Sequence, residues 1–157
     1  KKISQEALFG HIVVTENSRC SCGGEGCLET VASGLVLSSH ATLGKSVKVL
    51  CDEAETDPAK KQVLLDSAYY IAKALINTAA IVRPDTIIIG GGISLLPDIY
   101  FNHLVKTFNS LCPPIVNNNI SIERSTLKDR AGIVGIGIVA LDELIFNRSL
   151  LEQLKNH

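Results

Sequence analysis

The segment HIVVTENSRCSCGGEGC, residues 11–27, places one imidazole and three thiols within a short stretch of chain. His11, Cys20, Cys22 and Cys27 follow the spacing H-x8-C-x-C-x4-C, and four ligands of this kind suit a tetrahedral zinc ion. The glycines between the cysteines free the backbone to fold tightly around an ion. Because four protein ligands leave no coordination position for water, we expect a structural zinc and not a hydrolytic one.

Two other interpretations of the cysteines stay open on the sequence alone: a disulfide between two of them, or a set of free thiols. The chain holds five Cys, an odd number, and no signal peptide is visible, so zinc is favoured over a disulfide framework. His11 follows an apolar run. It is therefore either the fourth ligand or a packed core residue.

Longer motifs around this segment resemble the ROK family, which groups sugar-responsive repressors with sugar kinases. The run GHIVV (10–14), followed by CSCGGEGCLETVASG (20–34), resembles the family signature. DTIIIGGGIS (85–94) is similar to its second glycine motif, and KDRAGIVGIGIVAL (128–141) to its closing helix. The resemblance implies an α/β fold of the actin-like ATPase (ribonuclease H-like) type, with two α/β domains and a sugar in the cleft between them. Residues 1–157 would then be the C-terminal half of a ROK protein, its N-terminal domain absent from this chain.

The resemblance also implies the sugar ligands. Glu29 matches the Glu of the family's C-L-E motif, and His11 would touch the sugar as well as the metal. The alternative, less favoured, is that Glu29 is only an acid in the first turn of a helix, where the helix dipole stabilises it. The family usually carries Glu three positions before the metal His, but Leu8 stands there. Glu6 lies two residues too early, a displacement of about 7 Å along a strand.

A second candidate site follows the apolar run TIII (86–89), which predicts a buried parallel strand. Gly90, Gly91 and Gly92 come directly after it. Such a loop lets a nucleotide approach the backbone closely, although a glycine triplet is as often a plain turn. By its resemblance to the family, this loop looks like the segment that lies on the adenosine side of the nucleotide. We therefore expect these glycines to contact ATP if the protein is a kinase.

Hydrophobic periodicity predicts alternating helices and strands along the rest of the chain. We expect strands at 7–14, 86–89 and 120–122, and helices at 28–37, 59–82, 97–111 and 131–144. The helix at 59–82 gives the strongest signal, because apolar residues recur at spacings of three and four, and Pro84 ends it. The first strand would deliver His11 to the metal loop. The glycines of the last helix predict close contact with a neighbouring element, since packing must offset their low helix propensity.

Composition places the chain among globular proteins. With 157 residues, 46% of them hydrophobic and 20% charged, it can form one domain with a real core. The net charge of −1 gives no field that attracts phosphates, so DNA contact is expected only through the absent N-terminal domain. No apolar run reaches the roughly 18 residues of a membrane span, and no leader precedes the first motif. We expect a cytoplasmic protein without membrane contact.

Two functions remain. The first is the sugar-sensing and dimerisation domain of an N-acetylglucosamine-repressor-like transcriptional regulator, because the tail IFNRSLLEQLKNH (145–157) resembles the C-terminal extension of such repressors, and Leu8 argues against catalysis. The alternative is the C-terminal half of an ATP-dependent sugar kinase, of the glucokinase or N-acetylhexosamine kinase type. The phosphate loop and catalytic Asp that a kinase needs do not occur in this sequence, so we expect no phosphoryl transfer from this chain alone.

The expected ligand is a small sugar or sugar phosphate, and the expected assembly is a homodimer. The helix at 59–82 and the tail are the candidate subunit contacts. An apolar stripe on a helix is, however, more often part of a core than of an interface.

Overall fold

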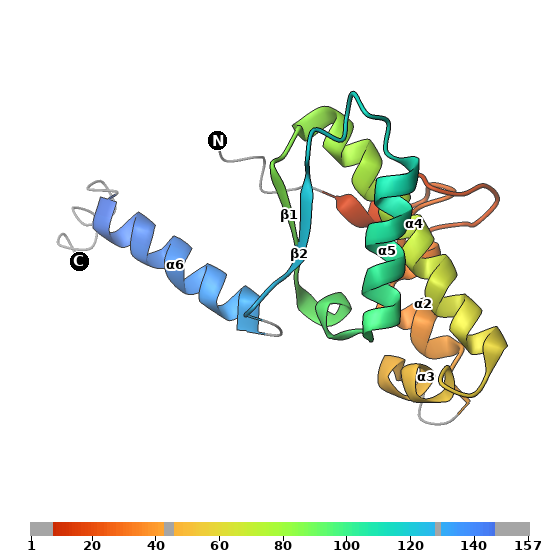
Figure 1. Ribbon diagram of the computed structural model, residues 1–157. Helices are drawn as coiled ribbons and strands as arrows, with labels where there is room; N and C mark the ends of the chain where they lie inside the picture. The colour runs from red at the N-terminus through yellow and green to blue at the C-terminus, as the bar shows by residue number, and fades with distance from the viewer. Residues whose placement is uncertain (1–7, 43–45, 128–129, 147–157) are drawn as a thin grey trace. The chain divides into compact units, whose positions relative to one another are not determined.

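The computed structural model describes residues 8–42, 46–127 and 130–146 (Figure 1). The chain forms two compact units, Lys1–Ile87 with Leu96–Ile122, and Ile88–Leu95 with Glu123–His157. In chain order the elements are η1 (Phe9–His11), α1 (Glu29–Ala32), α2 (Gly34–Ser39), α3 (Val47–Glu53), α4 (Pro58–Val82), β1 (Thr86–Ile89), η2 (Gly91–Leu95), α5 (Asp98–Leu111), β2 (Ser121–Arg124) and α6 (Ala131–Phe146), where η denotes a 3-10 helix.

The first unit is built on α4 and α5, which lie side by side (Figure 1). The apolar stripe of α4 forms its core, and all of the following side chains are buried: Leu64, Ala68, Ile71, Leu75 and Ala79. From α5, the buried Tyr100 reaches the buried Ser67 of α4 through a hydroxyl–hydroxyl contact of 3.0 Å. The predicted helices at 59–82 and 97–111 are confirmed to within one residue at each end.

The start and end of α4 have local causes. The Asp57 carboxylate accepts hydrogen bonds from the backbone N–H groups of Ala59 and Lys60, so it caps the helix. At the other end, Arg83 takes a left-handed conformation with φ of 52°, and Pro84 cannot continue the helix. The result is a helix of 25 residues, whose Lys73 reaches the cysteine segment at Val14.

The predicted helix at 28–37 is divided into α1 and α2. Ser33 breaks it by taking an extended conformation, with ψ of 154°. Its hydroxyl accepts a hydrogen bond from the N–H of Val36, so it caps the second helix instead of continuing the first. Glu29 nevertheless lies in the first turn of α1, as predicted.

The predicted strand at 7–14 is wrong over the described residues. Residues Phe9–His11 form the 3-10 turn η1, closed by a bond from the N–H of His11 to the carbonyl of Leu8. Val13 pairs with Cys27 only through an isolated bridge. The apolar pattern was therefore a poor guide here, because the local hairpin of the cysteine segment takes the backbone partners that a sheet would have supplied.

β1 and β2 form a two-stranded parallel pair. The N–H of Ser121 donates to the carbonyl of Asp85, and the N–H of Ser125 donates to that of Ile89, so both residue numbers rise together. The strand at 86–89 is confirmed, and that at 120–122 is observed as Ser121–Arg124. The expectation that the strand at 86–89 is buried is wrong for the described structure, because Ile88 is 66% exposed and only Ile89 is buried.

The last element, α6, confirms the predicted helix at 131–144. The expected close contact at its glycines is not found among the described residues: a Cβ added at Gly132, Gly135 or Gly137 would meet nothing within 4 Å. Ile133 is 78% exposed. The tail beyond residue 146 lies outside the described residues. In the part of the chain that the structure covers, no helix combines the length and apolar character needed to cross a bilayer.

Candidate metal centre and sugar site

The cysteine segment folds as a tight hairpin, which we call the metal hairpin (residues 13–27). Isolated antiparallel bridges pair Val13 with Cys27 and Arg19 with Glu25. Between them, the N–H of Val14 donates to the carbonyl of Gly26 at 2.9 Å. These bonds bring the two ends of the segment together, so that Cys27 returns to the vicinity of His11.

Gly26 is the point at which this hairpin is most constrained. Its φ is +75°, a left-handed conformation that residues with a Cβ rarely adopt. A Cβ built there would lie 2.1 Å from the carbonyl oxygen of Thr15. Its own N–H donates to the carbonyl of Ser18 at 2.8 Å. The two arms of the hairpin can approach this closely only because residue 26 has no side chain.

The hairpin brings together all four predicted metal ligands. One ligand atom from each of His11, Cys20, Cys22 and Cys27 lies within 4.8 Å of the other three. Cys20 Sγ is 3.6 Å from His11 Nδ1, and Cys22 Sγ is 3.7 Å from Cys27 Sγ. All five cysteines of the chain lie in the described residues and none forms a disulfide.

These separations fit a tetrahedral zinc ion. Bond lengths of about 2.3 Å to sulfur and 2.0 Å to nitrogen imply ligand separations of about 3.8 Å between two sulfurs and 3.5 Å between sulfur and nitrogen. The Cys20–His11 and Cys22–Cys27 separations agree with these values to within about 0.1 Å, and the whole set of four ligand atoms lies within 4.8 Å. His11 and the three thiols are thus gathered as a ligand set would be, and no disulfide joins them.

The thiols differ in how readily they ionise. Hydrogen bonding, first from the backbone of Cys22 and then from the side chains of Cys22 and His11, lowers the pKa of Cys20 to about 7. Burial raises the pKa of Cys27 to about 12. A bound divalent cation would deprotonate the coordinating thiols and release protons. Cys22 is the exposed member and Cys27 the buried one, so the centre is open to solvent on one side.

Glu29 lies next to the metal ligands. His11 turns its Nδ1 toward Cys20, while its Nε2 is 3.9 Å from Glu29 Oε2. The Glu29 side chain is 47% exposed. A Cβ at Gly10 would lie 3.6 Å from the same carboxylate oxygen, so the glycine leaves room for it. The arrangement presents a solvent-accessible carboxylate one imidazole away from the metal centre.

The sequence motifs did not reveal two hydroxyl groups that support the hairpin. Ser18 and Thr30 are joined by a hydroxyl–hydroxyl contact of 2.7 Å. Thr30 Oγ1 also donates to the carbonyl of Cys27 at 2.7 Å. They link the last metal ligand to the first turn of α1, which carries Glu29. Only their proximity in the fold reveals this role, since Ser and Thr are common at any turn.

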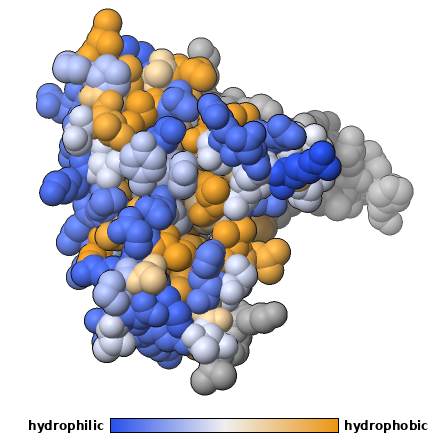
Figure 2. All heavy atoms as spheres, turned by 90° about the vertical axis from the view of Figure 1, so that its right-hand side faces the viewer, coloured by the Kyte–Doolittle hydropathy of each residue, from blue (hydrophilic) through white to orange (hydrophobic). Residues whose placement is uncertain are grey.

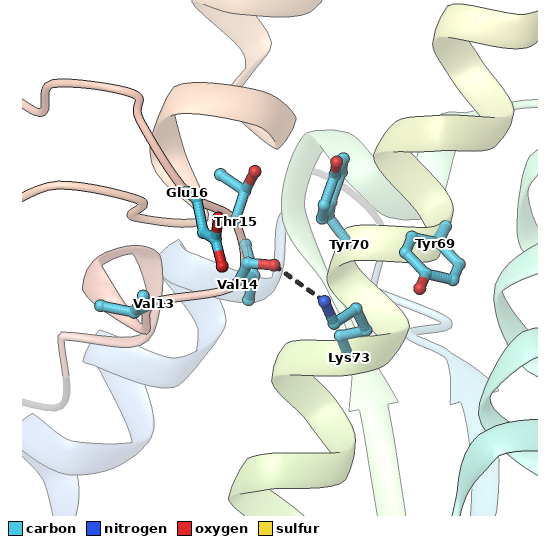
Figure 3. A pocket seen from close by; sticks show the side chains of 7 residues that line it. All are labelled: Val13, Val14, Thr15, Glu16, Tyr69, Tyr70 and Lys73. Carbon is cyan, nitrogen blue, oxygen red and sulfur yellow. Dashed lines mark hydrogen bonds between the residues drawn. The ribbon is translucent and has the colours of Figure 1, made fainter.

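Sequence analysis also missed Lys73 of α4. Its Nζ donates to the carbonyl of Val14 in the metal hairpin at 2.9 Å. The contact lies in an open pocket of about 530 Å³, shown in Figure 3, whose lining is Val13, Val14, Thr15, Glu16, Tyr69, Tyr70 and Lys73. No sequence signal joins residues that are 59 positions apart.

The glycine triplet lies in the second unit, whereas the metal ligands and Glu29 lie in the first. Gly91 has a left-handed φ of +65° and begins η2. A Cβ at Gly91 or Gly92 would meet nothing within 4 Å, so the backbone there is open to a ligand. Gly90 links β1 to η2 and is exposed.

Comparison with known proteins shows similarity to both repressors and kinases. The chain is 30% identical to a glucokinase of Halalkalibacterium halodurans, covering 82% of this chain and 46% of the relative. It is 26% identical to the DNA-binding transcriptional repressor Mlc of Escherichia coli, covering 93% and 39%. The chain thus spans about half the length, or less, of these relatives.

Solved structures extend the comparison to the fold. A ROK hexokinase from Thermus thermophilus superposes with a TM-score of 0.72 at 26% identity, covering 83% of this chain and 47% of that one. The sequence itself matches the ROK family over residues 5–143. The chain therefore belongs to the ROK family.

Proposed function

We propose that this chain is the sugar-sensing and dimerisation part of a ROK transcriptional regulator of the N-acetylglucosamine-repressor-like kind. It would be the C-terminal half of such a protein, in an actin-like ATPase fold, with a structural zinc held by His11, Cys20, Cys22 and Cys27. The observation that carries the proposal is the position of Glu29 beside the imidazole of the metal centre.

The sugar would be bound by Glu29 and His11. The Glu29 carboxylate is half exposed, and the His11 imidazole lies beside it. It therefore has lone pairs free to accept hydrogen bonds from sugar hydroxyls. His11 Nε2 points to the same side, while its Nδ1 faces the thiols. Zinc, when bound, would fix the orientation of this ring.

Leu8 supports a regulator over a kinase. It stands where the family pattern usually has a second acidic sugar ligand, and its side chain is 68% exposed. A kinase must orient one hydroxyl for transfer, and a lost ligand would weaken that positioning. A sensor needs only enough affinity to shift a conformational equilibrium.

The dimer contact would include the face of α4 that borders the metal hairpin. Tyr69 is 38% exposed there, and Val13 across the pocket is 63% exposed (Figure 3). On the face shown in Figure 2, apolar side chains lie in several patches separated by polar ones. Aromatic and aliphatic side chains of this kind are enriched in subunit interfaces. DNA contact would come only from a further domain of the full-length protein.

The first test is mass spectrometry of the intact, undenatured chain prepared with zinc. We expect one zinc per chain and a dimer mass. A metal-free chain would overturn the proposed centre. A monomer with zinc bound would overturn the dimerisation role alone.

Sugar binding is tested by calorimetry with N-acetylglucosamine and glucose. We expect binding that Glu29→Gln weakens by at least tenfold, the loss of about 1.4 kcal/mol. Glu55→Gln, an exposed acid outside the site, is the matched control and should leave the affinity unchanged. Equal affinity in the wild type and in Glu29→Gln would contradict the assigned sugar ligand.

The alternative is the C-terminal half of an ATP-dependent sugar kinase. One observation favours it: the exposed backbone at Gly90, Gly91 and Gly92, with no neighbour near a Cβ at the last two. The similarity to an N-acetylmannosamine kinase of Vibrio cholerae, 32% identical over 66% of this chain, points the same way. Binding of a non-hydrolysable ATP analogue that Gly91→Val removes would support the kinase, and no binding would support the regulator.

A further inference from the structure

Lys73 connects the long helix α4 to the metal hairpin. Its side chain is half-buried, and its Nζ donates to the carbonyl oxygen of Val14 at 2.9 Å (Figure 3). The Nζ also lies 5.6 Å from the ring centre of Tyr69 and 5.9 Å from that of Tyr70. Two aromatic rings at this range attract the ammonium group and hold it in place.

Val14 is a sensitive point of the hairpin. Its N–H donates to the carbonyl of Gly26, the residue next to the ligand Cys27. Lys73 donates to the carbonyl of Val14. The N–H of the same peptide group belongs to Thr15, and it donates to the Gly26 carbonyl at 3.3 Å. One residue therefore touches α4 on one side and the opposite arm of the hairpin on the other. The side chain of Val14 is buried, so it cannot shift without moving its neighbours.

We propose that Lys73 is a positioning residue for the metal centre, coupling the hairpin to the outer face of α4. The charged donor fixes the Val14 carbonyl, and Val14 in turn fixes the Gly26–Cys27 arm that brings the buried thiol to the other ligands. The inference rests on the zinc centre proposed above. Because coupling between two sites is reciprocal, metal binding must also restrict Lys73 and the two tyrosines that flank it.

The aromatic residues of the chain provide a direct readout. The sequence has three Tyr and no Trp. Tyr69 and Tyr70 flank Lys73, whereas Tyr100 is buried beside Ser67 in the core. Zinc added to metal-free protein should therefore shift the NMR ring signals of Tyr69 and Tyr70. The signals of Tyr100 serve as the internal reference and should stay in place. Tyr69→Phe and Tyr70→Phe assign the peaks.

The decisive measurement is zinc affinity, obtained by competition with a chromophoric chelator. Lys73→Met keeps the length and apolar stem of the side chain but removes the donor, and should weaken zinc binding about tenfold. Lys73→Arg restores a charged donor and should recover most of the affinity. Lys60→Met is the matched control, because Lys60 is another hydrogen-bonded lysine of α4 but pairs with Glu53 and Thr42, outside the hairpin. It should leave zinc affinity unchanged.

Each outcome decides the matter. The positioning role would be overturned if Lys73→Met bound zinc as tightly as the wild type, or if Lys60→Met lost as much zinc affinity as Lys73→Met. It would also be overturned if the NMR signals of Tyr69 and Tyr70 did not shift when zinc is added. If Lys73→Met does not fold by circular dichroism, the comparison of Lys73→Arg with wild type, together with the tyrosine signals, still tests the role. A wild-type chain that binds no zinc is a different failure, because it removes the proposed centre itself.

Discussion

Individual residues determine whether the metal hairpin can close, and Gly26 is the clearest case. A few residue types adopt a left-handed φ at an energetic cost. No side chain can be placed at residue 26, however, because its Cβ would lie 2.1 Å from the Thr15 carbonyl oxygen. Gly23 offers a comparison, since its φ is also positive, at +89°, yet a Cβ there would meet nothing within 4 Å. A substitution at Gly23 would therefore introduce backbone strain alone, whereas one at Gly26 would introduce both strain and a steric clash.

We therefore expect Gly26→Ala to open the hairpin and Gly23→Ala only to strain it. The first should abolish zinc binding and lower the melting temperature. The second should retain zinc and lose about 1 kcal/mol of stability. Metal content and thermal unfolding of both variants check this. Retention of one zinc per chain in Gly26→Ala would show that the close approach to Thr15 is dispensable.

The ligand assignment is tested by removing single thiols. Cys22→Ser and Cys27→Ala should each eliminate bound zinc and lower thermal stability, because three ligands hold the ion far more weakly than four. Cys51→Ser is the control: Cys51 is a half-buried thiol in α3, outside the cluster. Unchanged zinc stoichiometry in both hairpin variants would refute the assigned ligands, as would loss of zinc from Cys51→Ser.

The sequence predicted the candidate metal ligands better than the residues that support them through hydrogen bonds. His11 and the three cysteines are close in sequence, so a single tight hairpin is enough to bring them together in space. Thr30, Ser18 and Lys73 act through hydrogen bonds to backbone carbonyls or to one another, and such bonds leave no pattern in the sequence.

At the scale of elements, α3 is held to α4 by a small polar cluster. Lys60 of α4 forms an ion pair with Glu53 at the end of α3, and both groups also bind Thr42. The hydrogen bond from Lys60, and then those from Thr42, hold the pKa of Glu53 below its ordinary value of 4.5. A carboxylate whose pKa is lowered by folding stabilises the folded state only while it is ionised.

Stability should consequently depend on pH through Glu53. The contribution is complete above the ordinary pKa of 4.5 and disappears as the pH falls through the lowered folded-state value. Melting temperatures of wild type and Glu53→Gln should differ at neutral pH and converge in acid. A difference that persists unchanged to the lowest pH would show that Glu53 acts through packing and not through its charge.

Secondary-structure prediction from the sequence succeeded for one long helix and failed for two shorter segments. The helix α4 was predicted almost to the residue, because apolar residues recur at spacings of three and four from Leu64 to Ala79 and Pro84 marks its end. The run at 7–14 looked like a strand since it is apolar and β-branched, but short apolar runs have no fixed structure of their own. The helix at 28–37 broke at Ser33, whose hydroxyl caps α2.

At the scale of the whole molecule, the proposed zinc would join His11 to both arms of the metal hairpin. The described residues 8–28 contain only a 3-10 turn and isolated bridges as regular structure. Backbone hydrogen bonds across the metal hairpin hold this part of the chain, and bonds to the proposed zinc would add to them. Folding and metal binding are linked wherever the metal binds only the folded form.

Chelation should expose this dependence. Removing zinc from the intact chain is expected to lower the melting temperature and to increase proteolytic cleavage within residues 8–28, while α4 and α5 remain protected. Re-addition of zinc should reverse both effects. Limited proteolysis followed by mass spectrometry locates the cuts, and cleavage spread evenly over the chain would contradict a local role for the metal.

The parallel pair β1–β2 has a consequence of another kind. Within the described residues β1 and β2 pair with each other and no third strand joins them, so the sheet ends at both strands. Ile88 adds an exposed apolar side chain. Open strand edges of this sort recruit further strands, and parallel sheets are ordinarily covered on both faces. The pair is thus a template on which a wider sheet can grow, and in concentrated solution the same edges make the isolated chain prone to aggregation.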